Sequence, residues 1–252
     1  MLTKFFSGAL IKLEITRTLR NKKFMFFSVI YPSALYLLFA ASQNSTDKVK
    51  GTDLTFPALY MVSMASFGAI TAVLMGNSEK IAKEREKGWV RQLRLTTLPG
   101  RGYVLAKIAS AAVVTLPCIV VVFLVAAGAK GVRFEAWQWG ALTLAIWAGS
   151  LCFAALGVAI GYIASGDAVR PITMIIYFGM SILGGLWMPS TVFPQWLQNI
   201  AEWLPTHAYA ALGQAIELGN APHGKDLAIL VVYFLLFAGG AAWLYRKDTL
   251  KA

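Results

Sequence analysis

The chain offers few side chains that could hold a metal ion or carry out nucleophilic catalysis. Its two histidines, His207 and His223, and its two cysteines, Cys118 and Cys152, lie far apart and without the spacing of metal ligands. Both cysteines sit within apolar runs, which predicts neither a zinc site nor a disulfide framework. We therefore expect no catalytic residue and no metal site in this chain.

One short segment imitates a phosphate-binding loop. Residues 219–225 read GNAPHGK, with glycine and lysine at the spacing of such a loop. The next residue is Asp226, where a loop of this kind has a serine or threonine that holds magnesium, and no strand is expected before it. We expect no nucleotide to bind there.

Three further ionisable residues lie in or beside apolar segments. Asp167 and Arg170 share a short connection, which favours a local ion pair or a helix cap. Glu202 lies within a proline-broken stretch, where it could act near an exit route or point outward as an ordinary charge on a short helix. Both interpretations of Glu202 stay open on sequence grounds.

The composition excludes a soluble fold. The 252 residues are 58% apolar and only 14% charged, and yet the net charge is +11. Soluble domains average about 45–50% apolar and about 25% charged residues, and disordered chains are less hydrophobic still. A basic excess can mark a nucleic-acid partner, but in a chain this apolar it is first tested as a membrane-orientation signal. We predict an all-α integral membrane protein that forms a single transmembrane domain over residues 1–252.

Six apolar stretches have about the length of a membrane-spanning helix. The first is followed by polar residues and begins too late for a typical signal peptide, so it is interpreted as a retained span. Lys107 lies near the start of the third, where its long side chain could reach the interface. The six predicted spans are 24–42, 57–77, 103–128, 139–164, 171–188 and 227–245.

Two segments predict helices that do not cross the membrane. Residues 189–222 are broken by Pro189, Pro194 and Pro205 into pieces too short to span, which predicts a re-entrant helical hairpin between spans five and six. Residues 1–23 carry leucine and phenylalanine at helical spacing opposite basic side chains. This favours an amphipathic helix on the membrane surface over a simple basic flank.

The basic residues predict the orientation. With both termini placed in the cytoplasm, 18 lysines and arginines fall inside and 5 outside, whereas the acidic residues divide six and six. The positive-inside rule therefore predicts that both termini are cytoplasmic and that the hairpin is extracellular.

The largest predicted inner loop, residues 78–101, is rich in charge. Glu79–Lys83 and Lys80–Glu84 are helix-supporting i,i+4 relations, and Gly88 is expected to interrupt the helix. The loop could be a plain solvated connector. Large apolar side chains just beyond Gly88, such as Trp89, instead favour a surface that docks on another protein or on the membrane interface.

Gly157 and Gly161 form a G-x-x-x-G pattern in the fourth predicted span. Small residues at this spacing allow two helices to approach closely. Packing within one subunit is favoured, and a contact between two subunits is the alternative.

Two motif regions resemble the permease subunits of ABC-2 type transporters. The first is the EREKGWVRQLRL stretch, residues 84–95, which is similar to the family's glutamate–glycine–leucine pattern where a coupling helix meets the ATPase. The second is GGLWMP, residues 184–189, followed by Phe193-Pro194 and Leu204-Pro205-Thr206, which looks like the family's re-entrant helices. The resemblance covers almost the whole chain, and the Gly-Trp-x-Arg-Gln-Leu motif is similar to that of bacterial drug and antibiotic exporters.

The resemblance implies site residues in both regions. The implied ATPase-coupling residues are Glu84, Glu86, Gly88, Trp89, Arg91 and Leu93, with Arg91 and Arg94 on the exposed rim. The implied residues of the re-entrant exit region are Pro189, Pro194, Glu202 and Pro205.

The resemblance also implies a function and partners. The chain would be the permease subunit of an ATP-driven exporter in the cell membrane, moving an amphiphilic drug, antibiotic or lipid-like molecule outward. Two cytoplasmic ATPase subunits would bind ATP and magnesium, a second permease copy would complete a homodimer, and this chain would hold no cofactor. The alternatives are a secondary transporter and a membrane enzyme, but the chain shows no clear repeat, no mid-membrane ionisable group and no cluster of catalytic side chains.

Overall fold

The computed structural model describes residues 8–41, 48, 54–88, 100–164, 166–188 and 190–250. Within these ranges the regular secondary structure is helical, apart from an isolated bridge between Lys48 and Thr55. The elements are α1 (Gly8–Leu19), α2 (Lys22–Met25), the π-helix η2 (Phe26–Ile30), α3 (Tyr31–Ala41), α4 (Phe56–Glu86), α6 (Gly100–Ala129), α7 (Ala136–Ile163), η3 (Gly166–Ala168), α8 (Val169–Leu183), η4 (Ser190–Val192), α9 (Gln195–Ala201), α10 (Pro205–Glu217) and α11 (Gly224–Leu250).

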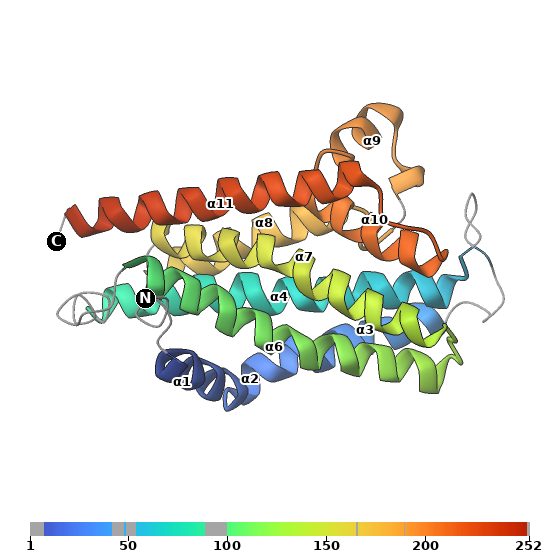
Figure 1. Cartoon of the computed structure of the whole chain (residues 1–252), viewed down its shortest axis with the longest axis horizontal. Coiled ribbons are helices and arrows are strands. Elements are labelled where there is room, and N and C mark those ends of the chain that lie inside the picture. The colour runs from blue at the N-terminus through green and yellow to red at the C-terminus, as the bar shows by residue number, and fades with distance from the viewer. Residues whose placement is uncertain are drawn as a thin grey trace.

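The helices form an elongated bundle around α4 (Figure 1). This central helix packs against α3, α6, α7, α8 and α10, and α11 closes the bundle along α7. Helix α1 lies against α6 at one end, which we call the α1 end, together with the C-terminal part of α11 (Figure 1). Helices α9 and α10 lie toward the opposite end, which we call the α10 end.

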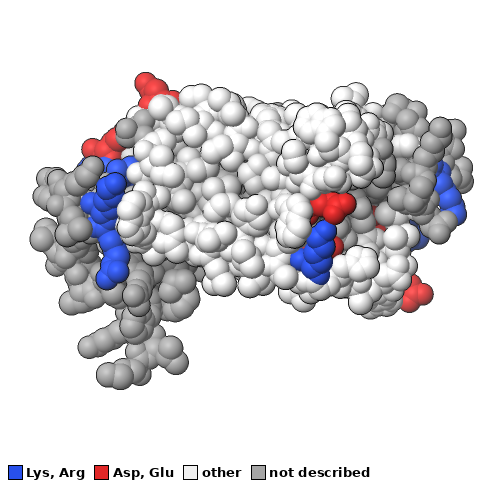
Figure 2. Space-filling model, turned by 90° about the horizontal axis from the view of Figure 1, so that it is seen from above, with Lys and Arg blue, Asp and Glu red and all other residues white. Residues whose placement is uncertain are grey.

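Among the described residues, four helices are long and apolar enough to cross a membrane. They are α4, α7 and the segments 106–129 of α6 and 224–247 of α11. The other two predicted spans also form helices, but the apolar helix 26–41 and the 15-residue α8 are shorter than a full crossing. Figure 2 shows the charged side chains toward both ends of the molecule, with a broad uncharged belt between them. The belt and the apolar helices are those of a multi-pass membrane protein.

Helix α4 is much longer than the span that the sequence predicts within it. Its 31 residues correspond to about 46 Å of helix, against a hydrocarbon thickness of about 30 Å. The excess lies at the α1 end, because α4 continues past the predicted span end at Asn77 to Glu86. The first part of the predicted inner loop 78–101 is therefore a helical extension of α4.

Close helix contacts depend on glycines that leave no room for a side chain. A Cβ atom at Gly157 would lie 2.8 Å from the Leu74 carbonyl oxygen, and one at Gly161 would lie 2.8 Å from the Ile81 Cβ. The G-x-x-x-G face of α7 thus packs on α4 of the same chain.

The first predicted span contains a local change of helix type. The π-helix Phe26–Ile30 comes directly before α3, and Pro32 is the second residue of α3. Proline lacks an N–H group and its ring crowds the carbonyl four residues earlier, which here belongs to Ser28. The wider π-turn accommodates the proline without ending the helix.

Helix α8 ends five residues earlier than predicted because of a glycine turn. Gly185 adopts a φ of 82°, a left-handed conformation that favours glycine. The Gly185 N–H donates to the Ile182 carbonyl at 3.1 Å, and the Leu186 N–H donates to the Ser181 carbonyl at 3.0 Å. This is a Schellman cap, and it turns the buried Leu186 back into the core.

We expect Gly157→Ala to destabilise the chain by about 1–3 kcal/mol, because the added methyl group meets the backbone of α4. Gly140→Ala in the same helix is the matched control, since nothing lies within 4 Å of its Cβ position. Thermal unfolding of the detergent-purified variants measures both effects. Equal unfolding temperatures for the two variants would contradict the proposed close contact.

Candidate functional site

The last turns of α4 form a junction with four neighbouring helices at the α1 end. The helix ends at Glu86, with the Lys87 N–H donating to the Lys83 carbonyl at 3.1 Å. Gly88 follows with a φ of 68° and nothing within 4 Å of its Cβ position. Its glycine is therefore required by backbone conformation and not by space, and the predicted interruption of the helix at Gly88 is confirmed.

A buried ion pair holds this end of α4 to α6. The Lys107 Nζ lies 2.7 Å from the Glu84 Oε1, and the Tyr103 hydroxyl donates to Glu84 Oε2 at 2.5 Å. Lys107 is only 1% exposed and Glu84 9%. The prediction that Lys107 extends toward the membrane surface is wrong, because the buried Glu84 carboxylate holds its ammonium inside the protein.

Helix α1 contacts the same part of α4. The Arg17 guanidinium lies 4.0 Å from Glu84, and the Lys80 ammonium donates to the buried Thr18 hydroxyl. Lys80 and Glu84, the i,i+4 pair that the sequence predicts, thus contact α1 and α6, and their mutual pairing stays a prediction. The N-terminal helix is attached to the bundle through α4 as well as through its packing on α6.

Arg85 ties α4 to the end of α7. Its guanidinium donates to the Gly161 carbonyl at 3.1 Å and to the Ala164 carbonyl at 3.4 Å. It also lies over the Tyr162 ring, 5.4 Å from the centroid. A cation at a helix C-terminus satisfies carbonyls that have no partner within the helix and interacts favourably with the helix dipole.

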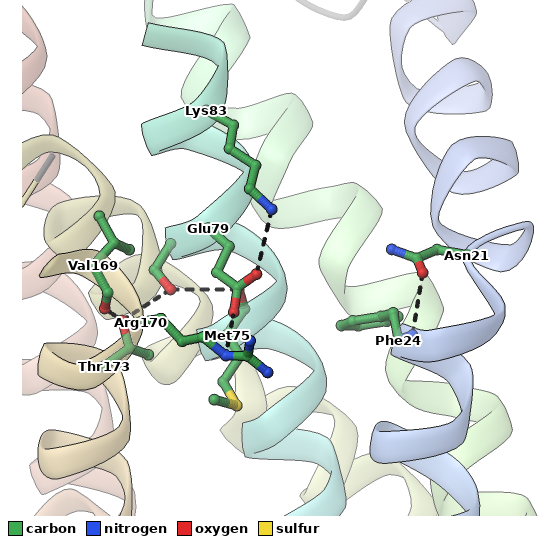
Figure 3. A network of polar contacts seen from close by, with 9 residues as sticks. Asn21, Phe24, Met75, Glu79, Lys83, Val169, Arg170 and Thr173 are labelled. Atoms are coloured by element: carbon green, nitrogen blue, oxygen red, sulfur yellow. Dashed lines mark hydrogen bonds and ion pairs between the residues drawn. The ribbon is translucent and has the colours of Figure 1, made fainter. Parts of the chain in front are cut away.

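Glu79 links α4 to α8, as Figure 3 shows. It pairs with Lys83 one turn along α4 and with Arg170 of α8, both at 3.7 Å. Arg170 therefore reaches Glu79 rather than Asp167. One turn deeper, the Thr173 hydroxyl donates to the Ser78 hydroxyl at 3.1 Å. Helices α1, α6, α7 and α8 thus each have a polar contact with the end of α4.

Three of the predicted coupling residues lie within the described part of the chain. Glu84 is buried in the junction, Glu86 is exposed at the last residue of α4, and Gly88 makes the turn. Trp89, Arg91 and Leu93 lie outside the described residues, as does Arg94.

The sequence alone does not predict the junction, because Arg17, Glu84 and Lys107 are far apart along the chain. The one available signal was Lys107 itself, a lysine near the start of an apolar span.

The exit motif builds the turns around two short helices at the α10 end. Pro194 precedes α9, and Pro205 is the first residue of α10, where proline's fixed φ suits a helix start. Pro189 lies outside the described residues. Thr206 packs against Gly184 and donates to the Met180 carbonyl at 2.6 Å, which ties α10 to the end of α8. Two short helices therefore occupy the predicted hairpin, and their depth in the bilayer stays a prediction.

Glu202 forms an exposed ion pair with Lys225 across 2.9 Å. The hydrogen bond and the charge of Lys225 lower the pKa of Glu202, and the lysine also lies 5.2 Å from the Trp203 ring centroid. This is the outward-facing charge that the sequence allowed, now with a partner on α11. A shallow cavity beside the pair is lined by Glu202, His207, Ala211, His223, Gly224, Lys225 and Asp226. Burial lowers the pKa of His207.

The fold and the junction define a helical multi-pass membrane protein whose long central helix α4 leads into a charged segment of the sequence. Comparison with known proteins agrees. Residues 33–243 match the ABC-2 family transporter protein family. The chain is 31% identical over 235 residues to YvfS of Bacillus subtilis (strain 168), which its name assigns to the transport permeases, and the match covers 93% of this chain and 95% of that protein. The chain belongs to the ABC-2 family of membrane transporters.

Removing one partner of the buried pair should be costly. We expect Lys107→Met to destabilise the chain by about 3–5 kcal/mol, because the buried Glu84 carboxylate would lose the ammonium 2.7 Å away and the largely exposed Arg17 at 4.0 Å would not replace it. Lys83→Met, at the exposed Glu79 pair, is the matched control and should change stability by about 0–1 kcal/mol. Unfolding curves of the purified variants compare the two.

A double-variant cycle tests whether the pair acts as a unit. Glu84→Gln combined with Lys107→Met should lose less stability than the sum of the two single changes, since neither charge is then left alone. Additive losses would contradict the ion pair as the source of the effect.

Proposed function

We propose that this chain is the membrane subunit of an ATP-driven exporter and that loop 78–101 receives the motion of a separate cytoplasmic ATPase. The observation that carries the proposal is the junction at the end of α4. The helix that leads into the loop is fixed there by a buried ion pair to α6 and by polar contacts to α1, α7 and α8. Membership of the ABC-2 family implies association with an ABC ATPase.

The junction makes the end of α4 a stiff connection. A force applied at Gly88 would reach the buried Glu84 within little more than one turn, and the junction would pass it to α1, α6 and α7 together. Because packed helices move as discrete bodies and do not deform continuously, such a push would be expressed as a tilt or a slide of whole helices. Glu84 thus acts inside the junction, and the residues that contact the ATPase are Glu86, Trp89, Arg91 and Leu93.

The seam between α4 and α8 contains contacts that could break and re-form during such a motion. Along α8, Thr173, Tyr177 and Ser181 repeat every four residues and are buried. Thr173 meets Ser78, and the Tyr177 hydroxyl donates to the Phe67 carbonyl at 3.1 Å. A separation of α8 from α4 would expose this polar stripe within an apolar protein. A surface of that kind suits an amphiphilic drug, antibiotic or lipid-like substrate.

The assembly and its orientation follow from the same reasoning. The basic excess supports placing the α1 end, with both termini, in the cytoplasm of a cell whose plasma or inner membrane holds the protein. The ATPase would then meet the α1 end, and the α10 end would face outward. Two permease copies, as a homodimer, would serve two ATPase copies that bind ATP and magnesium.

The test is co-purification with the ATPase. Glu86→Lys should weaken recovery of the ATPase subunit by at least about tenfold, because the reversed charge would stand at the proposed contact. Glu202→Lys reverses an exposed acid at the α10 end and is expected to leave recovery unchanged. The two recoveries are compared by quantitative pull-down from membranes that contain both subunits.

Substrate-stimulated ATP hydrolysis provides a second readout. ATP hydrolysis by the reconstituted complex should rise with an added amphiphilic drug, and the rise should be lost in Glu86→Lys. Full ATPase recovery and full stimulation in this variant would overturn the proposed coupling. A secondary transporter would show transport without any ATPase subunit.

A further inference from the structure

A cavity opens at the α10 end where three connections meet. It has a volume of about 470 Å³ and lies between the start of α4, the link from α6 to α7 and the end of α10. Its wall is mixed, with apolar side chains such as Leu54, Val132 and Phe134 beside the half-buried Lys130, the exposed Arg133, and Glu217 at the end of α10. Its lining residues are Leu54, Thr55, Pro57, Ala58, Lys130, Gly131, Val132, Arg133, Phe134, Glu217 and Leu218.

Glu217 is an unsatisfied acid. The residue is 6% exposed, and both carboxylate oxygens are covered and have no hydrogen-bond partner. The buried Tyr36 hydroxyl of α3 is within electrostatic reach of Glu217 and is also without a partner. Gln138 of α7 donates to the Ile216 and Glu217 backbone carbonyls at 3.0 and 3.3 Å, which fixes the backbone but leaves the carboxylate unpaired.

An unpaired buried carboxylate is unfavourable, and two chemical events relieve it. It can take up a proton, and burial accordingly raises the pKa of Glu217 well above its usual range. It can also pair with a cation that enters the site. A neutral side chain would fill the same position at lower cost, so the acid indicates a ligand with a positive group.

The other charges narrow the class of ligand. Lys130 and Arg133 stand at the cavity edge and attract an anionic group, and Arg in particular can bind a phosphate through two parallel hydrogen bonds. The apolar wall formed by Leu54, Val132 and Phe134 suits a hydrocarbon chain. A ligand that meets all three conditions has an ammonium group, a phosphate and an apolar tail.

We propose that this cavity binds a zwitterionic amphiphile of the phosphoethanolamine type. Its ammonium group pairs with Glu217 after a rotation of that side chain, and its phosphate contacts Lys130 and Arg133. The site requires only that the α10 end lie at a membrane surface, where such headgroups are found, and does not depend on the proposed ATPase coupling.

The experiment measures lipid binding to the intact, detergent-purified chain by native mass spectrometry. Phosphatidylethanolamine should bind at least about tenfold more tightly than phosphatidylglycerol, which has the phosphate but no ammonium group. Glu217→Gln should remove this preference, and Glu202→Gln, an acid at the same end but outside the cavity, should keep it. A preference that survives Glu217→Gln, or equal binding of the two lipids to the unaltered chain, would overturn the proposal.

A second set of variants guards against loss of folding. Lys130→Ala combined with Arg133→Ala changes a half-buried and an exposed residue outside the core and should weaken phosphatidylethanolamine binding by about tenfold. Lys225→Ala, an exposed lysine elsewhere at this end, is the control and should bind as the unaltered chain does. Unchanged binding in the double variant would count against the phosphate contact.

Soluble phosphoethanolamine distinguishes the source of the ligand. Competition by this compound would show that the headgroup alone is recognised, whereas retained lipid binding without competition would show that the acyl chain is needed. Both results are consistent with the site. Lowering the pH should weaken binding as Glu217 takes up its proton, and Lys130, Arg133 and Tyr36 are the other titratable groups around this site. Glu217→Gln should bind independently of pH over the same range.

Discussion

The ion pair between Glu84 and Lys107 is the interaction on which the α1 end of the bundle depends. It lies where α4 and α6 emerge toward the charged loop, and it is shielded from water by the Tyr103 ring and by α1. Buried pairs are no guarantee of stability, because desolvation offsets much of their attraction. Their value here is geometric. Two apolar surfaces could slide past one another, but a paired charge allows one relative position of α4 and α6.

The same constraint explains why so many polar contacts gather in so short a segment. Over seven consecutive residues, from Glu79 to Arg85, α4 makes polar contacts with α8, α1, α6 and α7. A helix that emerged from the membrane unsupported would fray over its last turns. Here the side-chain contacts replace the packing that the membrane no longer provides, and they hold the start of the loop in a fixed direction.

Much of the fold could be predicted from the sequence, because apolar stretches and charge excess are local signals. Helices form at all six predicted spans, and Gly88 ends α4 as expected. The limits of α8 were misjudged, since the apolar run continues through Leu186 and Trp187 and hides the glycine turn. The partners of Glu84, Arg170 and Glu202 could not be predicted, because each lies on another helix far along the chain, and sequence spacing carries no information about such contacts.

Gln138 has a consequence for the order in which the bundle assembles. Its side-chain oxygen accepts the Glu135 N–H at the start of α7, and its amide nitrogen donates to the last carbonyls of α10. These carbonyls belong to residues made almost eighty positions later. During synthesis the Gln138 amide at the start of α7 therefore has no α10 carbonyl to bind until α10 has been made. The helices up to α7 complete this contact only when α10 joins them, so the parts of the chain before and after α8 become one folded body late and together.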